Sequence, residues 1–313
     1  MSLMPCRFIM ETSRTRVLAW LHLACHGLAG AACSGEEFGP GGEVDSVNVV
    51  KTELCVKTIR ANRERIVGVK VRLDRNISNN GENERFVLKQ ALVAAREAEV
   101  PLMIHHTNST VSLEEVLESL SPGDVYTHTL SQWAGEGRGI LDPERRAVRP
   151  CVLQARARGI LFDVGHGQGS FSWEIAEVCA RAGFYPDTLS TDLHSGNVDG
   201  LARDLPWVMS KFLHLGTTSL IRPNYPPSLL AGMPLADLIT AVSSSPAQLI
   251  GRQAELGRLE AGREADISVL SLDQLELPGQ QAVDCAGQQR NITRLLRPRY
   301  VIRGGELDTI VQD

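Results

Sequence analysis

The chain of 313 residues lacks a CxxC pair, a run of Lys and Arg, and an apolar stretch long enough to cross a membrane. Seven scattered cysteines exclude a zinc ribbon and do not resemble a disulfide framework, so we expect reduced thiols and a cytoplasmic protein. A net charge of -5 and a pI of about 5.9 argue against nucleic acid or an anionic membrane as the main partner, because both bind basic surfaces.

One segment, VLAWLHLACHGLAGAAC (17–33), has two possible interpretations. Arg14 and Arg16 precede an apolar stretch that small residues follow, as in a signal peptide. His22 and His26 interrupt the apolar stretch, however, and favour a buried strand followed by a loop.

Short apolar runs alternate with amphipathic stretches along most of the chain, which indicates an α/β protein with a mainly parallel sheet. Strands are predicted at 17–21, 66–71, 101–105, 124–128, 159–164 and 188–191. Helices are predicted at 47–64, 84–99, 113–120, 143–158, 172–182, 204–213 and 235–244. After residue 250 the pattern changes to short β segments, so we predict a barrel-like domain over 1–250 and a small β domain over 251–313.

Polar side chains end five successive predicted strands: Lys70, His105, His128, Asp163 and Asp192. They are separated by 35, 23, 35 and 29 residues, and each interval suits one strand and one helix. A (β/α)8 barrel carries its active site at the carboxyl ends of its strands. This regular succession therefore predicts one functional site at that end of the sheet.

Three of these residues, His105, His128 and Asp192, are typical ligands of a divalent metal, above all zinc. A catalytic metal lowers the pKa of a water molecule, and a carboxylate such as Asp192 can take and pass on its proton. A cationic Lys70 suits a metal site only if it is neutralised or modified. The alternative is that these side chains cap loops and that Lys70 is a buried, ion-paired lysine.

Several segments together resemble the amidohydrolase superfamily, and within it the metal-dependent deacetylase branch near dihydroorotase. They are IVGVKVR (66–72), PLMIHH (101–106), DVYTHT (124–129), FDVGHGQGSF (162–171), LSTDLH (189–194) and VMSKFL (208–213). LGRLEAGREADISVL (256–270) is similar to the superfamily's small β domain.

The resemblance implies a (β/α)8 TIM-type barrel with metal ligands at Lys70, His105, His128 and Asp192. Lys70 would be carboxylated and bridge two metal ions, His105 and His128 would bind the second ion, and Asp192 would bind the first and shuttle protons. Adjacent residues of a strand point to opposite faces, so only one histidine of the pair at 105 and 106 can face the metal. The family pattern assigns this role to His105.

Two further histidines, His166 and His194, are predicted to contact substrate. The alternatives are that the glycine-rich segment around His166 is a tight turn and that His194 holds its loop in place. Met209-Ser-Lys211 does not have the spacing of a serine-lysine hydrolase, so we predict that it belongs to a helix surface and its packing.

The chain has no His-x-His pair, which the resemblance would place on a first barrel strand. The similarity starts near Phe8, so we expect strands three to eight of an incomplete barrel and a truncated N-terminus. His22 and His26 are weak candidates to replace the missing pair.

The predicted reaction is hydrolysis of an acyl group, such as acetyl, from a small acylated amino or hydroxy acid. One alternative is a cyclic-amide hydrolase similar to dihydroorotase. Another is an inactive relative that binds a ligand or pairs with another subunit. A homo-oligomer is compatible with the sequence.

Overall fold

The structure, a computed structural model, describes residues 4–25, 27, 42–134, 139–215, 232–276 and 278–310. These residues fall into two compact units. The first contains Met1–Thr127, Trp133–Arg138 and Pro150–Leu161, and the second contains His128–Gln132, Gly139–Arg149 and Phe162–Asp313.

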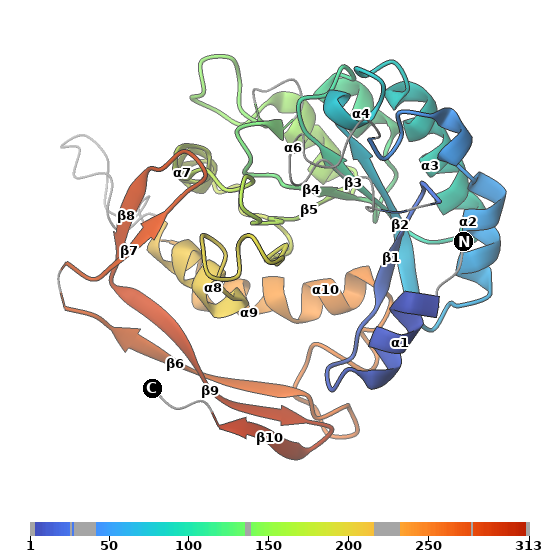
Figure 1. Cartoon of the computed structure of the whole chain (residues 1–313). Coiled ribbons are helices and arrows are strands. Elements are labelled where there is room, and N and C mark those ends of the chain that lie inside the picture. Colours follow the sequence, from blue (N-terminus) through green and yellow to red (C-terminus); the bar gives the residue numbers. More distant parts are fainter. Residues whose placement is uncertain are drawn as a thin grey trace. The chain divides into compact units, whose positions relative to one another are not determined.

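The first unit is built on a parallel sheet whose strands follow one another in chain order (Figure 1). They are β1 (Ala19–His22), β2 (Ile66–Leu73), β3 (Leu102–His106), β4 (Val125–Thr127) and β5 (Leu161–Phe162). The predicted parallel α/β sheet is therefore confirmed, and the strand interpretation of the segment around residue 20 holds for β1. Among the residues that the structure describes, the strands form an open sheet, as expected for an incomplete barrel.

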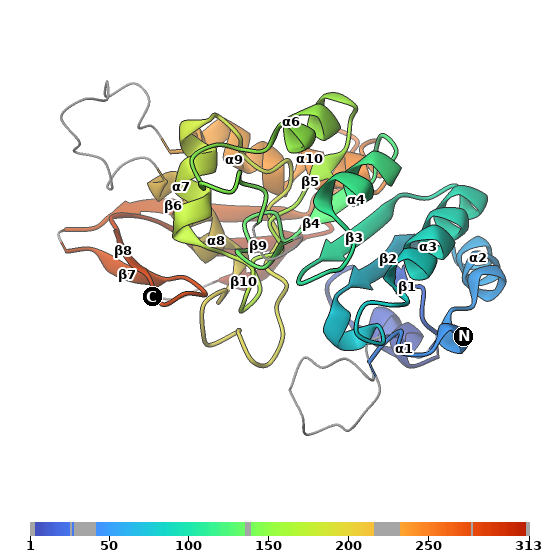
Figure 2. The same ribbon diagram turned by 90° about the horizontal axis from the view of Figure 1, so that it is seen from above.

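The first unit also contains helices, and α3 (Glu84–Ala98) packs on the sheet. They are α1 (Met4–Thr12), η3 (Val47–Val49), α2 (Thr52–Arg60), η4 (Arg75–Ile77), α3 (Glu84–Ala98), α4 (Leu113–Ser119) and α6 (Pro150–Ala157). Figure 2 shows α2 and α3 lying side by side, and α3 packs on β2. The helix predicted over 143–158 begins only at Pro150, because proline suits the first position of a helix and the preceding residues form a bridge between Leu141 and Val148.

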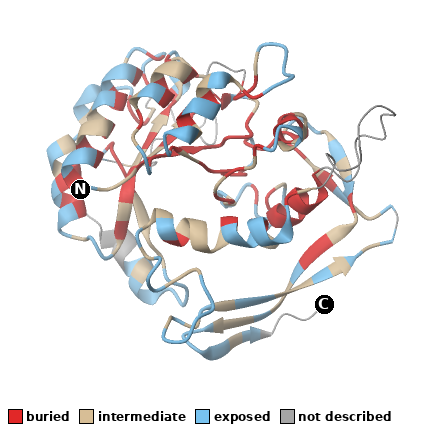
Figure 3. Ribbon diagram, turned by 180° about the vertical axis from the view of Figure 1, so that it is seen from behind, coloured by how far each residue is buried: buried red, intermediate tan, exposed pale blue. Residues whose placement is uncertain are grey.

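The two faces of the sheet differ in polarity. Val69, Val71 and Ile104 share the face on which α3 packs and are fully buried, whereas Lys70 and His105 on the other face are partly exposed. Figure 3 colours the buried stretches of the ribbon red. Lys70 and His105 therefore lie on the face that is turned away from the buried apolar residues.

The second unit continues the alternation of strand and helix. Residues 187–191 run parallel to 162–166, because Val164 N donates to Thr188 O and His166 N donates to Ser190 O. The helices are α7 (Trp173–Arg181), α8 (Leu205–His214), α9 (Leu235–Val242) and α10 (Ser244–Leu249). The last predicted strand, 188–191, thus forms parallel backbone hydrogen bonds with residues 164–167.

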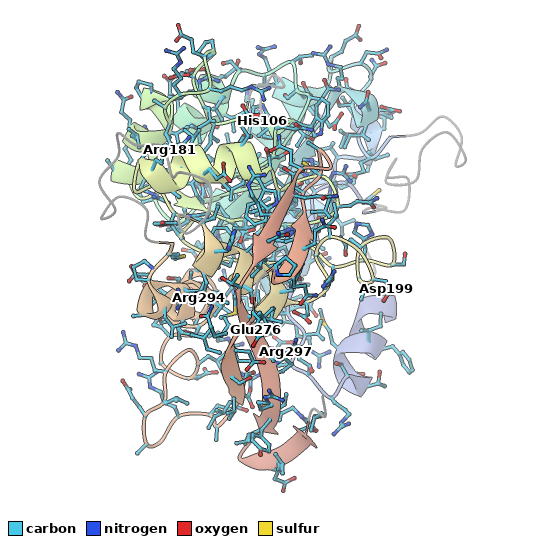
Figure 4. The ribbon with its side chains drawn as sticks, turned by 90° about the vertical axis from the view of Figure 1, so that its left-hand side faces the viewer. His106, Arg181, Asp199, Glu276, Arg294 and Arg297 are labelled. Carbon is cyan, nitrogen blue, oxygen red and sulfur yellow. The ribbon has the colours of Figure 1, made fainter. Side chains whose placement is uncertain are left out.

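Small antiparallel sheets follow these helices, as predicted. One contains β6 (Ile267–Gln274), β9 (Arg294–Arg303) and β10 (Glu306–Ile310) in the order β10-β9-β6, and the other pairs β7 (Gln280–Val283) with β8 (Gln289–Ile292). Figure 4 labels Arg294 and Arg297 on β9. The division into 1–250 and 251–313 stays a prediction.

The hairpin β7–β8 is bonded to α7. The carboxylate of Asp284, in the hairpin turn, accepts the N–H of Trp173 at 2.8 Å, and Arg290 Nε lies 2.6 Å from Glu177 Oε1. Ser172 at the N-cap position makes no side-chain cap bond, so Asp284 supplies the cap from a distant part of the sequence.

None of the helices in the described part of the chain is both long and apolar enough to cross a membrane.

Candidate functional site

The register of the first sheet decides which side chains share its polar face. His22 pairs with Lys70, and Arg72 pairs with His105, so these four point to the same side. His106 points to the opposite side. It is fully buried, with Nε2 2.9 Å from Val111 O, and Figure 4 labels it. The alternation that separates His105 from His106 is therefore present as predicted.

His105 is held by a short chain of hydrogen bonds. Its Nε2 lies 2.7 Å from Thr107 Oγ1, and Thr107 Oγ1 donates to Asp74 Oδ2 at 3.0 Å. Since the single hydroxyl hydrogen is used on Asp74, Thr107 must accept from His105 Nε2–H. In the neutral ring, the lone pair is therefore on His105 Nδ1.

A buried ionic cluster lies next to Lys70 and was not predicted. Glu43 is fully buried; its Oε1 lies 2.7 Å from Arg72 NH1 and its Oε2 lies 2.7 Å from His22 Nε2. Ala24 N donates to His22 Nδ1 at 3.1 Å, so the other ring nitrogen, Nε2, is the one that faces Glu43. Nδ1 of His22 thus accepts a backbone hydrogen bond and Nε2 lies against a carboxylate, which argues against a role as a replacement metal ligand. His26 lies outside the described residues.

In the second unit, His128 follows β4 with a left-handed backbone, φ 61°. A positive φ is uncommon for a non-glycine residue and often marks a functional site. The ring is buried, and its Nδ1 lies 2.7 Å from the carbonyl oxygen of Gly165. A carbonyl can only accept, so Nδ1 carries the hydrogen and Nε2 carries the lone pair.

Asp192 is also left-handed, with φ 46°, and lies at the end of the last strand-like segment. Its carbonyl accepts from Asn197 Nδ2 at 2.8 Å, and the fully buried Asn197 also accepts the N–H of His194 at 3.0 Å. Both Asp192 and His194 have exposed side chains. Asn197 thus fixes the loop that presents them.

The segment Gly165–Gly167 joins the two residues of this unit that were predicted to bind metal. Gly165 accepts from His128, and Gly167 N donates to Thr191 O next to Asp192. A Cβ at Gly167 would lie 2.8 Å from Asp192 Oδ2, so Asp192 lies directly over this glycine. The structure therefore brings His128 and Asp192 onto one support.

His166, in the middle of this segment, is 1% exposed and stacks on Phe171 with ring centroids 4.9 Å apart. Its Nε2 lies 2.8 Å from Nζ of Lys211, which is fully buried. Lys211 lies in a helix and in its packing, as predicted, but the prediction of a helix surface was wrong for this side chain. A lysine inside the apolar stretch WVMSKFL was a signal that it needs a buried partner.

Burial shifts the pKa of both groups. Desolvation, followed by the charge of Lys211, lowers the pKa of His166 to about 3. Desolvation also lowers the pKa of Lys211 to about 7, while Asp284 acts in the opposite direction. His166 is therefore neutral at pH 7.

The donor chemistry of the predicted ligands suits a divalent cation. His105 and His128 can each be neutral with the tautomer set by a second hydrogen bond, which is the usual state of a metal-binding histidine. Within the described ranges, however, no group of three His, Cys, Asp or Glu side chains is placed to hold a metal. Lys70 and His105 belong to the first unit, and His128 and Asp192 belong to the second.

Comparison with known proteins gives consistent matches. The profile of the "Amidohydrolase family" matches residues 179–307. A deacetylase of Brucella anthropi is 31% identical over 302 residues, which are 96% of this chain and 67% of that protein. A deacetylase of Agrobacterium fabrum is 31% identical over 299 residues, 96% of this chain and 65% of that protein. The chain thus spans about two thirds of the length of these relatives.

Two solved structures resemble the fold. An adenine deaminase matches with a TM-score of 0.81 and 26% identity, over 98% of this chain and 74% of that one. A dihydroorotase matches with a TM-score of 0.79 and 29% identity, over 97% of this chain and 72% of that one. The similarity includes the small C-terminal sheets, because nearly the whole chain is covered.

Proposed function

The chain belongs to the amidohydrolase family, and we propose that it is a metal-dependent hydrolase that removes an acyl group, such as acetyl, from a small acylated amino or hydroxy acid. The observation that carries this proposal is that two relatives named deacetylase each match 96% of the chain. A cytoplasmic location and a homo-oligomer are part of the same proposal.

The proposed metal ligands are Lys70, His105, His128 and Asp192, with zinc as the expected metal and Lys70 carboxylated. When bound, the metal would act as a Lewis acid on the acyl carbonyl and lower the pKa of a water molecule. The support lies in the two imidazoles, since the hydrogen bonds from His105 Nε2 and His128 Nδ1 leave the lone pairs on the opposite ring nitrogens.

Asp192 is the proposed proton carrier. Its exposed carboxylate can receive a proton from water and pass it to the leaving group, while Asn197 holds its backbone in place. His194 lies in the same loop, two residues on, and is the more accessible of the two proposed substrate contacts. His166 is buried, so any effect that it has on substrate would act through its loop.

A second candidate is cyclic-amide hydrolysis, which the dihydroorotase match at 29% identity favours. A third is an inactive relative that binds a ligand or partner, which the lack of a three-donor group among the described residues favours.

A substrate panel separates these candidates. The purified chain, loaded with zinc, is incubated with N-acetyl amino acids, O-acetyl hydroxy acids, dihydroorotate and adenine. We expect acetate release that a chelator abolishes and that Asp192→Asn reduces by about 10²-fold or more. Turnover of dihydroorotate alone would favour the second candidate. Zinc binding without any turnover would favour the third.

A further inference from the structure

Lys211 of α8 is a buried amine with three acceptors around its Nζ atom. Its Nζ lies 2.8 Å from His166 Nε2, 3.2 Å from Leu201 O and 3.1 Å from Val283 O. An ammonium group has three N–H donors and no acceptor, so three acceptors satisfy it completely. The Phe171 ring, with its centroid 4.8 Å from Nζ, adds a cation–π contact.

The partner of this cation can adopt only one tautomer. His166 Nδ1 lies 2.9 Å from Gly167 O, which can only accept, so Nδ1 carries the hydrogen. His166 Nε2 therefore carries the lone pair and accepts from Lys211. If Lys211 is removed, Nε2 is left buried without this donor.

The backbone on either side of His166 supports the two proposed ligands. Gly165 O orients the ring of His128, and Gly167 lies under the carboxylate of Asp192. His166 N also donates to Ser190 O at 3.0 Å, two residues before Asp192. Movement of the His166 ring would therefore displace both contacts together.

We propose that Lys211 is a positioning residue: through His166 it fixes the segment Gly165–Gly167, and with it the tautomer of His128 and the place of Asp192. Because Val283 at the end of β7 accepts the third N–H, the hairpin β7–β8 is part of this support. The inference rests on the proposed function only for the metal-binding role of His128 and Asp192.

The alternative is that Lys211 merely stabilises the core. Four variants distinguish the two roles. Lys211→Met keeps the length of the side chain and removes its amine, whereas Phe212→Leu perturbs the next residue of the same helix, which is also fully buried. His166→Gln retains an acceptor for Lys211, and His166→Met of similar size does not.

The first readout is histidine 15N NMR, which needs neither metal nor turnover. The native protein should show His128 and His166 as Nδ1–H tautomers. Lys211→Met should convert His128 to a tautomer mixture, whereas Phe212→Leu should preserve it even if its melting temperature falls equally. An unchanged His128 spectrum in folded Lys211→Met would overturn the proposal.

The second readout is zinc affinity, measured by competition with a chelating dye. Loss of a group that orients a metal ligand typically weakens binding by about 10–100-fold, which we expect for Lys211→Met and His166→Met. His166→Gln and Phe212→Leu should bind within about threefold of the native protein by the same reasoning. Equal zinc affinities of His166→Gln and His166→Met would contradict the proposal. This comparison remains decisive even if Lys211→Met does not fold. If the native chain binds no zinc, the proposed function fails, and the NMR comparison still decides the role of Lys211.

Discussion

Replacement of Gly167 by alanine tests the support beneath Asp192 with a single methyl group. Gly167 has φ +50°, a region that costs an L-residue about 1–2 kcal/mol. In addition, the new Cβ would lie 2.8 Å from Asp192 Oδ2, closer than Cβ contacts found in proteins. The carboxylate must therefore move away, because the glycine backbone is held by the bond from Gly167 N to Thr191 O.

The consequence should appear mainly in catalysis. A displacement of about 1 Å in a reacting group can cost about 10²-fold in rate, so kcat/KM of Gly167→Ala should fall by that order. The strain alone should lower Tm by only about 2–4 °C or less. The assay is acetate release from the substrate that the panel identifies, with Tm measured by calorimetry.

Gly169 provides a matched control in the same loop. It has no positive φ, and a Cβ built on it meets no atom within 4 Å, so Gly169→Ala should retain native activity and Tm. The reasoning is refuted if Gly167→Ala keeps native kcat/KM, or if both alanine variants lose activity equally.

Two further predictions concern stability. Burial lowers the pKa of His166 to about 3 and that of His214 to about 4, so both stay neutral in the folded chain while the unfolded chain takes up protons below about pH 6.5. Stability is thus lost as the pH falls from 6.5. At pH 4.5, urea unfolding should give a free energy of unfolding about 2–3 kcal/mol lower per histidine than at pH 7. His214→Gln should remove the contribution of one histidine to this pH dependence. Glu43→Gln should lower the free energy of unfolding by about 3–5 kcal/mol because it leaves the partly buried Arg72 guanidinium without its fully buried carboxylate partner. Glu115→Gln, which breaks an exposed pair with Arg85, should cost less than about 1 kcal/mol. Equal effects of these two glutamine variants would contradict the assigned importance of burial.

Local sequence pattern was sufficient for the elements that depend on nearby residues. The apolar positions of 84–98 repeat at helical spacing, and α3 forms there within one residue of the prediction. The alternation in PLMIHH likewise separates His105 from His106 correctly, because side chains alternate along a strand regardless of its neighbours.

Long-range polar contacts could not be predicted in the same way. Glu43 meets His22 of β1 and Arg72 of β2, and no spacing in the sequence encodes that meeting. Asp284 likewise caps α7 from 111 residues away. Lys211 was more accessible to prediction, since a lysine surrounded by apolar helix residues must find buried acceptors.

The proposal that His105 and His128 are ligands of the same divalent metal is tested most directly by zinc content after equilibrium dialysis. His105→Asn and His128→Asn should each lose bound zinc, whereas His106→Gln, on the helix-facing side of the same strand, should keep the native content. Zinc retained by both asparagine variants, or lost only from His106→Gln, would contradict this proposal.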